Sequence, residues 1–537
     1  MPVSRESFYK GTFILTAAGV VVKIIGSLNW IFVSRILGGE GIGLYQMAFP
    51  IYLMALSISS AGIPVAISII TAERLALGDV LGARRIFRIS LAILTVTGIL
   101  FSMATYLGAE WLIDLRFIRD PRAYYAIVAL APAIFFVTML SSYRGYLQGW
   151  QRMTPTAVSQ VVEQIFRVIT MVLFAYMLLP SGLEFAAAGA SLGAFAGAVA
   201  GFIVLLYYNH KLEREIAEEV ASQKQKAGDS KGDPCEKIIK RIFWLALPVS
   251  ASSLMLPLVA NLDLMIVPMR LEVAGFTVAE ATEYFGYLTG MAVPLTNLAT
   301  ILTGALAVSL VPAVSEAKAL GDKVRIAFRT GAAMRITTII TFPAFILVFM
   351  LHTEISTLIY NAPLAGPVVG YLATAIVFLG IHQVTTGILQ GLGHTTVPLV
   401  NMAVAAVAKV GLNWVLTAIP VLGILGATIA TTVYMGLAAV MNLYFIHRYV
   451  GYRISLTESA KTIAAACIMA ISIYFTYNSL ATTSDSILVM TVVSALIGSI
   501  VYTGVLLMLG MIRREDVAGV PYVGDKLTRL FCRIGVF

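Results

Sequence analysis

The sequence predicts an all-α polytopic membrane protein, and its composition, hydropathy and charge placement each favour this fold class. Hydrophobic residues make up 59% of the 537 residues, and charged residues make up only 12%. A soluble domain carries about 25% charged residues, so this chain cannot cover a water-facing surface. Its apolar runs are about 20 residues long, which suits a transmembrane helix better than the strands of a membrane barrel.

Apolar runs separated by charged or turn-forming segments predict fourteen transmembrane helices. The first run contains Lys23 and is too long for the core of a secretory signal, so we expect it to remain as a spanning helix. The predicted spans are residues 11–33, 46–70, 88–109, 124–143, 155–179, 185–208, 242–268, 286–311, 331–351, 366–389, 396–418, 422–446, 460–479 and 487–511.

The distribution of basic residues predicts that both termini are cytoplasmic. With fourteen spans, only five of the 37 Lys and Arg residues fall in outside loops, and most of the others lie on the inner side. Cytoplasmic loops are the basic ones in membrane proteins, so the formal charge of +9 indicates topology rather than a nucleic-acid partner. The five outside residues are Arg35, Arg116, Arg119, Arg122 and Arg270.

Matched segments predict an internal duplication. Gly145-Tyr-Leu-Gln-Gly149 matches Gly387-Ile-Leu-Gln-Gly391 at a distance of 242 positions, and Glu73–Asp79 matches Glu316–Asp322 at 243. A repeat of six spans is even, so both copies enter the membrane in the same direction and form a parallel repeat. The expected domains are a six-helix bundle at 1–208, a cytoplasmic connector at 209–239, a second six-helix bundle at 240–450, two extra helices at 451–511 and a basic cytoplasmic tail at 512–537.

Five ionisable residues lie well inside predicted spans: Lys23, Glu163, Arg167, Asp263 and Lys409. Each costs at least about 2.5–3.5 kcal/mol at the bilayer centre, which marks them as candidate functional residues. Arg167 and Lys409 hold matching positions in the two repeats, as expected for an anion-binding central cavity with one cation from each half. Glu163 and Arg167 are four positions apart, so mutual neutralisation on one helix face is an alternative.

Three further arginines lie at span ends and are candidates for the rim of this cavity: Arg35, Arg144 and Arg270. Topology or contact with lipid headgroups is the other explanation for them. The sequence contains no phosphate-binding loop, no zinc-protease motif and no dinucleotide fingerprint. We therefore expect neither an enzyme nor a bound cofactor or metal.

Several motifs resemble the polysaccharide-export flippases of the multidrug/oligosaccharidyl-lipid/polysaccharide exporter superfamily. The resemblance is greatest to the branch that includes stage V sporulation protein B and the lipid II flippases. The motifs are Lys10-Gly-Thr-Phe-Ile-Leu, Ala17-Ala-Gly19, Ser34-Arg-Ile-Leu-Gly38, Gly41-Ile-Gly-Leu-Tyr45, Gly62-Ile-Pro-Val-Ala-Ile-Ser68, Arg144-Gly-Tyr-Leu-Gln-Gly149 and Gln160-Val-Val-Glu-Gln-Ile-Phe-Arg167.

The resemblance implies a twelve-helix core with two extra helices in the bacterial plasma membrane. It also implies a cationic cavity and a lipid-linked saccharide that moves from the inner to the outer leaflet, with Lys23, Arg167 and Lys409 facing its pyrophosphate. Membrane lipids and cell-wall synthesis proteins are the other expected partners. A cation-coupled drug or metabolite antiporter, using Asp263 or Glu163, and a non-transporting scaffold are the alternatives.

Overall fold

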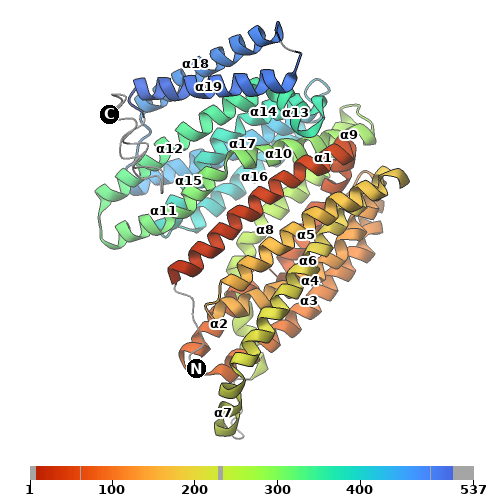
Figure 1. Ribbon diagram of the computed structural model, residues 1–537, viewed down its shortest axis with the longest axis vertical. Coiled ribbons are helices and arrows are strands. Elements are labelled where there is room, and N and C mark those ends of the chain that lie inside the picture. Colours follow the sequence, from red (N-terminus) through yellow and green to blue (C-terminus); the bar gives the residue numbers. More distant parts are fainter. Residues whose placement is uncertain (1–7, 61, 228–233, 484, 512–537) are drawn as a thin grey trace. The chain divides into compact units, whose positions relative to one another are not determined.

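A computed structural model describes residues 8–60, 62–227, 234–483 and 485–511 (Figure 1). Within these ranges all regular secondary structure is helical, as the hydropathy predicts. The chain divides into two compact units, Met1–Gly290 and Met291–Phe537, which are described separately below. The predicted basic tail at 512–537 lies outside the described residues.

The first unit is built from long helices, some of which extend well beyond the apolar run that predicted them. They are α1 (Phe8–Ser60), α2 (Ile63–Ala76), α3 (Val80–Asp114), α4 (Tyr124–Gly149), α5 (Thr154–Leu178), α6 (Leu183–Glu215), α7 (Ala217–Ala227), α8 (Cys235–Val273) and α9 (Val278–Gly286), with the short helices η1 (Pro121–Ala123) and η2 (Leu179–Ser181). The π-helix η3 (Tyr287–Ala292) leads into the second unit.

The second unit contains more short and bent helices. They are α10 (Val293–Ala299), α11 (Ile301–Ala319), α12 (Lys323–Met350), α13 (His352–Tyr360), η4 (Pro363–Ala365), α14 (Gly366–Ala373), α15 (Ala375–Gly391), α16 (Thr396–Leu416), α17 (Ile424–Val450), α18 (Leu456–Ala481) and α19 (Ile487–Met508). The last two helices pack against each other, and α18 packs against α12.

Within the described residues, twelve helical stretches are long and apolar enough to cross a membrane, or thirteen if the bent pair α14–α15 is one span. The predicted count of fourteen is not confirmed. The first two predicted spans fall in one continuous stretch, Ala17–Ala76, and the eighth is broken by the π-turn and by Thr300. Hydropathy locates apolar runs, but it does not locate such breaks.

Residues 34–45, predicted as a loop, are helical in the structure and belong to α1. The helix kinks at Gly38, whose φ of 64° lies in the left-handed region that glycine adopts without steric cost. The 53 residues of α1 correspond to about 80 Å of helix summed over both sides of the kink, far more than the roughly 30 Å of a hydrocarbon core. On its two sides of the kink, α1 contains the first predicted span and the first part of the second, which continues into α2.

The predicted connector at 209–239 is largely helical where the structure describes it. The end of α6 is tied down by ion pairs of Glu213 with Arg84 and of Glu215 with Arg152. The side chain of Gln223 on α7 donates to the carbonyl of Gly78 over 2.6 Å. The two compact units also meet at residue 290 rather than at the connector, because α8 and α9 pack against α1.

The duplicated glycines make equivalent helix contacts in the two units. A Cβ atom on Gly145 would lie 2.6 Å from the carbonyl oxygen of Pro64, and one on Gly387 would lie 2.5 Å from that of Ala307. Pro64 and Ala307 are themselves 243 positions apart. The spacing of small residues therefore brings α4 against α2, and α15 against α11, in the same way.

The duplicated Leu-Gly-Asp segments also fold alike. Gly78 and Gly321 both have positive φ values, 73° and 68°, at the turn between two helices. The side chain of Asp79 accepts from the backbone N–H of Gly82 and caps α3, and Asp322 caps α12 through the N–H of Arg325. These paired caps support the predicted duplication at the level of single hydrogen bonds.

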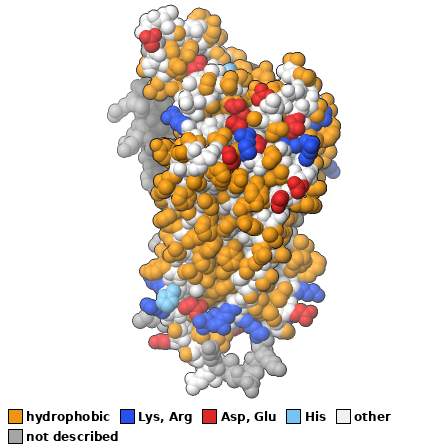
Figure 2. Space-filling model, turned by 90° about the vertical axis from the view of Figure 1, so that its right-hand side faces the viewer, with side chains coloured by type: hydrophobic (Ala, Val, Ile, Leu, Met, Phe, Trp, Pro, Cys, Tyr) orange, Lys and Arg blue, Asp and Glu red, His pale blue; other side chains and the backbone are white. Residues whose placement is uncertain are grey.

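Hydrophobic side chains predominate on the face shown in Figure 2, and charged side chains gather toward its two ends. Many large apolar side chains of α3 and α5 are exposed, among them Leu107, Trp111, Ile169 and Tyr176. Lipid, not water, is the solvent that such a surface requires. The chain is a multi-pass membrane protein.

Candidate functional site

The close packing of α5 on α6 positions the best candidate site. A Cβ atom on Gly197 would lie 2.6 Å from the carbonyl oxygen of Glu163 and 2.9 Å from Cβ of Arg167. Gly201, one turn further along α6, faces Cβ of Glu163 at 3.2 Å. The glycines let the two backbones approach closely, and this fixes the part of α5 that carries the two charged side chains.

Glu163 bridges two arginines from two helices. Its Oε1 accepts from Nη2 of Arg167 on α5 over 2.7 Å, and its Oε2 accepts from Nη2 of Arg144 on α4 over 2.9 Å. Nε of Arg144 donates to the hydroxyl of Ser159 over 3.1 Å. Two guanidinium groups share one carboxylate, so this cluster keeps one surplus positive charge. We call Arg144, Glu163 and Arg167 the cationic cluster.

The cationic cluster is mostly shielded from solvent. The side chains of Arg144, Glu163 and Arg167 are 17%, 13% and 22% exposed. On the side of α1, the Arg167 guanidinium interacts with the hydroxyl group of Tyr52. Nε of Arg167 is buried and has no hydrogen-bond partner within the described residues. The site therefore retains donor capacity that could serve an incoming oxyanion.

The structure places Lys409 in the second unit, where it is only 5% exposed on α16. Its Nζ lies 5.5 Å from the ring centroid of Tyr434 on α17, a cation–π distance. Lys409 occupies the same place on α16 as Arg167 on α5, but its neighbours are different. A carboxylate and a second arginine accompany Arg167, and an aromatic ring covers Lys409.

The other predicted site residues are more scattered. Lys23 is exposed on α1, one turn before Gly26, whose Cβ position faces the amide of Gln164 on α5 at 3.3 Å. Arg35 is exposed near the kink of α1, and Asp263 is half-buried on α8. Arg144, Glu163 and Arg167 thus meet in space. The roles of Lys23, Arg35 and Asp263 in binding stay predictions.

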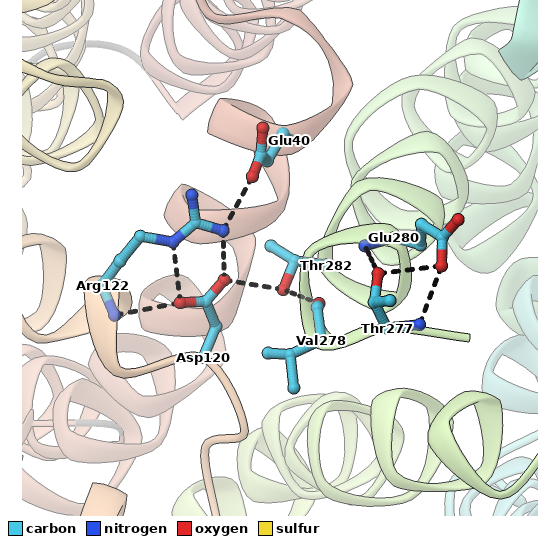
Figure 3. Close-up of polar contacts among 7 residues, drawn as sticks. All are labelled: Glu40, Asp120, Arg122, Thr277, Val278, Glu280 and Thr282. Carbon is cyan, nitrogen blue, oxygen red and sulfur yellow. Dashed lines mark hydrogen bonds and ion pairs between the residues drawn. The ribbon is translucent and has the colours of Figure 1, made fainter. Parts of the chain in front are cut away.

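A second polar cluster, which the sequence did not indicate, joins three segments of the first unit (Figure 3). Asp120 is 1% exposed and accepts from Nε and Nη2 of Arg122 over 3.0 and 2.7 Å. The same Nη2 lies 2.7 Å from Oε1 of Glu40 on α1. The hydroxyl of Thr282 on α9 donates to Asp120 over 3.0 Å. We call these four residues the Asp120 latch.

The Asp120 latch links elements from both predicted repeats, because Glu40 and Thr282 are 242 positions apart. Next to it, Gly39 and Gly43 of α1 pack against Thr282 and Gly286 of α9 at backbone contact distance. Nearby, Arg119 forms an ion pair with Glu272 on α8 at 3.5 Å. Asp120 and Thr282 are 162 positions apart, so no local pattern could have paired them. The local sequence offers only a weak signal, which is that Asp120 precedes a proline and lies between the predicted outside residues Arg119 and Arg122.

Comparison with known proteins identifies two protein-family models that match this chain. Residues 8–318 match the family model described as polysaccharide biosynthesis protein, and residues 289–415 match the MatE model. The chain is 28% identical to stage V sporulation protein B of Bacillus subtilis (strain 168), over 98% of this chain and all of that protein. It is 24% identical to the lipid II flippase MurJ of the same organism, over 86% and 87% of the two chains.

Solved structures show the same fold. A structure titled lipid II flippase MurJ, inward closed conformation, aligns with a TM-score of 0.70 and 14% identity over 92% of this chain and 98% of that one. An inward-facing multidrug resistance MATE family transporter of the MOP superfamily aligns with a TM-score of 0.66 and 17% identity, over 80% and 94% of the chains.

Proposed function

This chain belongs to the polysaccharide biosynthesis protein family, which makes it a membrane transporter or flippase of the MOP superfamily, and from that premise we propose its cargo and mechanism. The cargo we propose is an undecaprenyl-pyrophosphate-linked saccharide, a peptidoglycan precursor such as lipid II. The protein moves the headgroup from the inner to the outer leaflet by alternating access. The observation that carries this proposal is the cationic cluster, with two arginines and one carboxylate inside membrane-spanning helices.

The cationic cluster has the chemistry that a pyrophosphate needs when it leaves water. A guanidinium group presents a planar fork of donors that matches phosphate oxygens, and it stays charged in an apolar environment. Glu163 holds Arg144 and Arg167 in place when no cargo is bound. The arriving phosphate then replaces the carboxylate as their partner, so the buried charges are never left without a counter-charge.

The Asp120 latch fits the conformational cycle of this mechanism. By the predicted topology, residues 115–123 lie at the outer end of the first bundle, and the latch ties them to α1 and α9. Opening toward the outside requires these contacts to separate, because they join segments of the two repeats. Transport then alternates between a state with the latch closed and a state with it open.

The membrane potential supplies a driving force for this cargo. An inside-negative potential favours outward movement of negative charge by about 2.3 kcal/mol per charge and per 100 mV. The pyrophosphate therefore moves downhill electrically, and the sequence carries no ATP-binding loop. The polyprenyl tail remains in lipid while the headgroup crosses.

The test replaces one arginine and follows the headgroup. We expect Arg167→Gln, produced in a bacterium whose own flippase is depleted, to lower the outer-leaflet fraction of lipid-linked precursor at least tenfold. A membrane-impermeant hydrolase measures that fraction. Arg152→Gln is the matched control, because Arg152 also pairs with a glutamate but lies outside the cationic cluster. Normal flipping by Arg167→Gln at equal membrane abundance would contradict the proposal.

A cation-coupled antiporter is the second candidate, and the MatE match over residues 289–415 favours it. In that mechanism Glu163 or Asp263 binds the coupling cation or a cationic drug, so the amide variants lose efflux. In the flippase mechanism Glu163→Gln keeps a neutral acceptor between the arginines and preserves anion binding. Flipping retained with Glu163→Gln, and lost with Arg167→Gln, supports the flippase. The reverse pattern supports the antiporter.

A further inference from the structure

The second unit contains an apolar cavity of about 410 Å³ that the transport mechanism does not use. Its walls come from α12, α15 and the start of α18, and the loop at 451–455 borders its mouth. Ligand sites in proteins commonly have volumes of about 300–1,000 Å³. The cavity can therefore hold part of one flexible ligand.

The cavity is polar at one end and apolar at the other. Arg335 and Phe345, which both line it, are ten residues apart on α12, or about 15 Å along the helix. A ligand that fills it has a polar head and an apolar chain. The polar end is lined by Arg335, Tyr452, Ser455, Glu458 and Ser459, and the other end, which is mostly apolar, by Phe342, Phe345, Thr374, Val377 and Phe378.

The polar end carries a pair of opposite charges. Arg335 is 7% exposed, and its Nη1 lies 3.9 Å from Oε1 of Glu458, whose side chain is 33% exposed. Arg335 is the deeper of the two charges, and Glu458 lies nearer the surface.

We propose that this cavity binds a phospholipid whose headgroup carries both a phosphate and a primary ammonium group, as phosphatidylethanolamine does. The phosphate binds the Arg335 guanidinium, the ammonium donates to the Glu458 carboxylate, and an acyl chain enters the apolar end. Basic pockets between membrane helices commonly hold phosphate headgroups. A purely anionic headgroup would place its phosphate beside Glu458 with no cation to offset that carboxylate.

The proposed lipid site is separate from the proposed transport site. None of the cationic-cluster residues lines the cavity, and neither does Lys409. By the predicted topology its mouth, at 451–459, lies at the cytoplasmic end of α18. The bound lipid therefore comes from the inner leaflet and stabilises the contact of α18 with α12 whether or not cargo is present.

The test measures lipid binding by the purified full-length protein. After lipid removal in detergent, the protein is titrated with phosphatidylethanolamine, phosphatidylglycerol or phosphatidylcholine, and its thermal unfolding is followed. Bound lipid is identified by native mass spectrometry. We expect phosphatidylethanolamine to raise the unfolding temperature more than the other two lipids do. Arg335→Gln and Glu458→Gln should each weaken this binding at least tenfold.

Arg329→Gln is the matched control, because Arg329 lies on the same helix and pairs with Glu316 at 3.4 Å outside the cavity. It should leave the lipid-dependent shift unchanged. If Arg335→Gln fails to fold, Ser459→Trp obstructs the mouth with both charges intact and should also abolish the shift. Equal shifts with all three lipids, or a shift that survives Arg335→Gln, would overturn the proposal. So would a polyprenyl lipid as the bound species.

Discussion

The two predicted repeats have matching helix contacts but differ in where they carry charge. Both use the same glycine contacts and the same aspartate caps. The arginine pair and carboxylate of the first repeat, however, have uncharged counterparts in the second, except where Lys409 matches Arg167. At a distance of 242 positions, Arg144 matches Thr386, Glu163 matches Ala405 and Asp120 matches Ala362.

The second repeat replaces the cationic cluster with a neutral network. Asn442 on α17 accepts from Nδ2 of Asn401 over 2.8 Å, and its own Nδ2 donates to the hydroxyls of Thr385 and Thr386 over 3.2 and 3.1 Å. Amide and hydroxyl groups can join helices inside a membrane without the desolvation cost of charge. The difference shows that the matched glycines and caps serve packing in both repeats, whereas the arginine–carboxylate cluster that we propose for cargo binding occurs in the first repeat.

The largest expected effect tests the shared scaffold. Gly145→Ala and Gly387→Ala each place a Cβ atom within 2.6 Å of a carbonyl oxygen, so each should lower the free energy of unfolding by about 1–3 kcal/mol. Gly411→Ala is the control, because its Cβ meets no atom within 4 Å. Thermal unfolding in detergent measures all three. If Gly145→Ala lowers the free energy of unfolding and Gly387→Ala does not, the two helix contacts are not equivalent.

The next effect concerns a charge that only the first repeat carries. Asp120→Ala gives the first repeat the residue type of the second, and it removes the acceptor for Arg122 and Thr282. Because Glu40 still pairs with Arg122, we expect a loss of about 1–2 kcal/mol. Asp114→Ala, an exposed change just upstream, should have little effect on unfolding. If Asp120→Ala and Asp114→Ala change the free energy of unfolding equally, the Asp120 latch does not stabilise the protein.

A smaller and symmetric effect is expected at the helix caps. Asp79→Ala and Asp322→Ala each remove one N-cap acceptor, at a cost of about 1 kcal/mol. Asp79 also pairs with Arg74 at 3.1 Å, so its loss should be slightly the larger. Unfolding measurements on the single variants and the double variant should give nearly additive values. Strong non-additivity would mean that the two turns are not independent copies.

The smallest expected effect is a pH dependence of unfolding that comes from Glu280, in the second repeat. Hydrogen bonds from the backbone and hydroxyl of Thr277 lower the pKa of Glu280 in a capping box at the start of α9 (Figure 3). A lowered folded-state pKa gives stability that is present above the ordinary carboxyl range and lost as pH falls through the lowered pKa. Glu280→Gln should therefore flatten a shallow acid-side slope in unfolding temperature. If the slope is unchanged in Glu280→Gln, the acid-side loss of stability comes from other carboxylates.

Hydropathy and charge predicted the membrane class, the helical fold and most helix positions. Helix continuity could not be predicted, because the kink at Gly38 and the π-turn at Tyr287–Ala292 depend on packing rather than on local polarity. The Glu163–Arg167 pair could be anticipated from its spacing of four residues on one helix. The contact of Arg144 with Glu163 could not be, because it depends on how α4 meets α5.

The central claim is that the first repeat binds the phosphate of the cargo, and direct binding of undecaprenyl pyrophosphate to the purified protein tests it. We expect the Arg144→Gln/Arg167→Gln double variant to bind at least a hundredfold more weakly than the wild type, which is about 3 kcal/mol. Lys409→Met, in the second repeat, should weaken binding tenfold or less. A double variant that binds as tightly as the wild type, or a larger loss with Lys409→Met, would contradict the account.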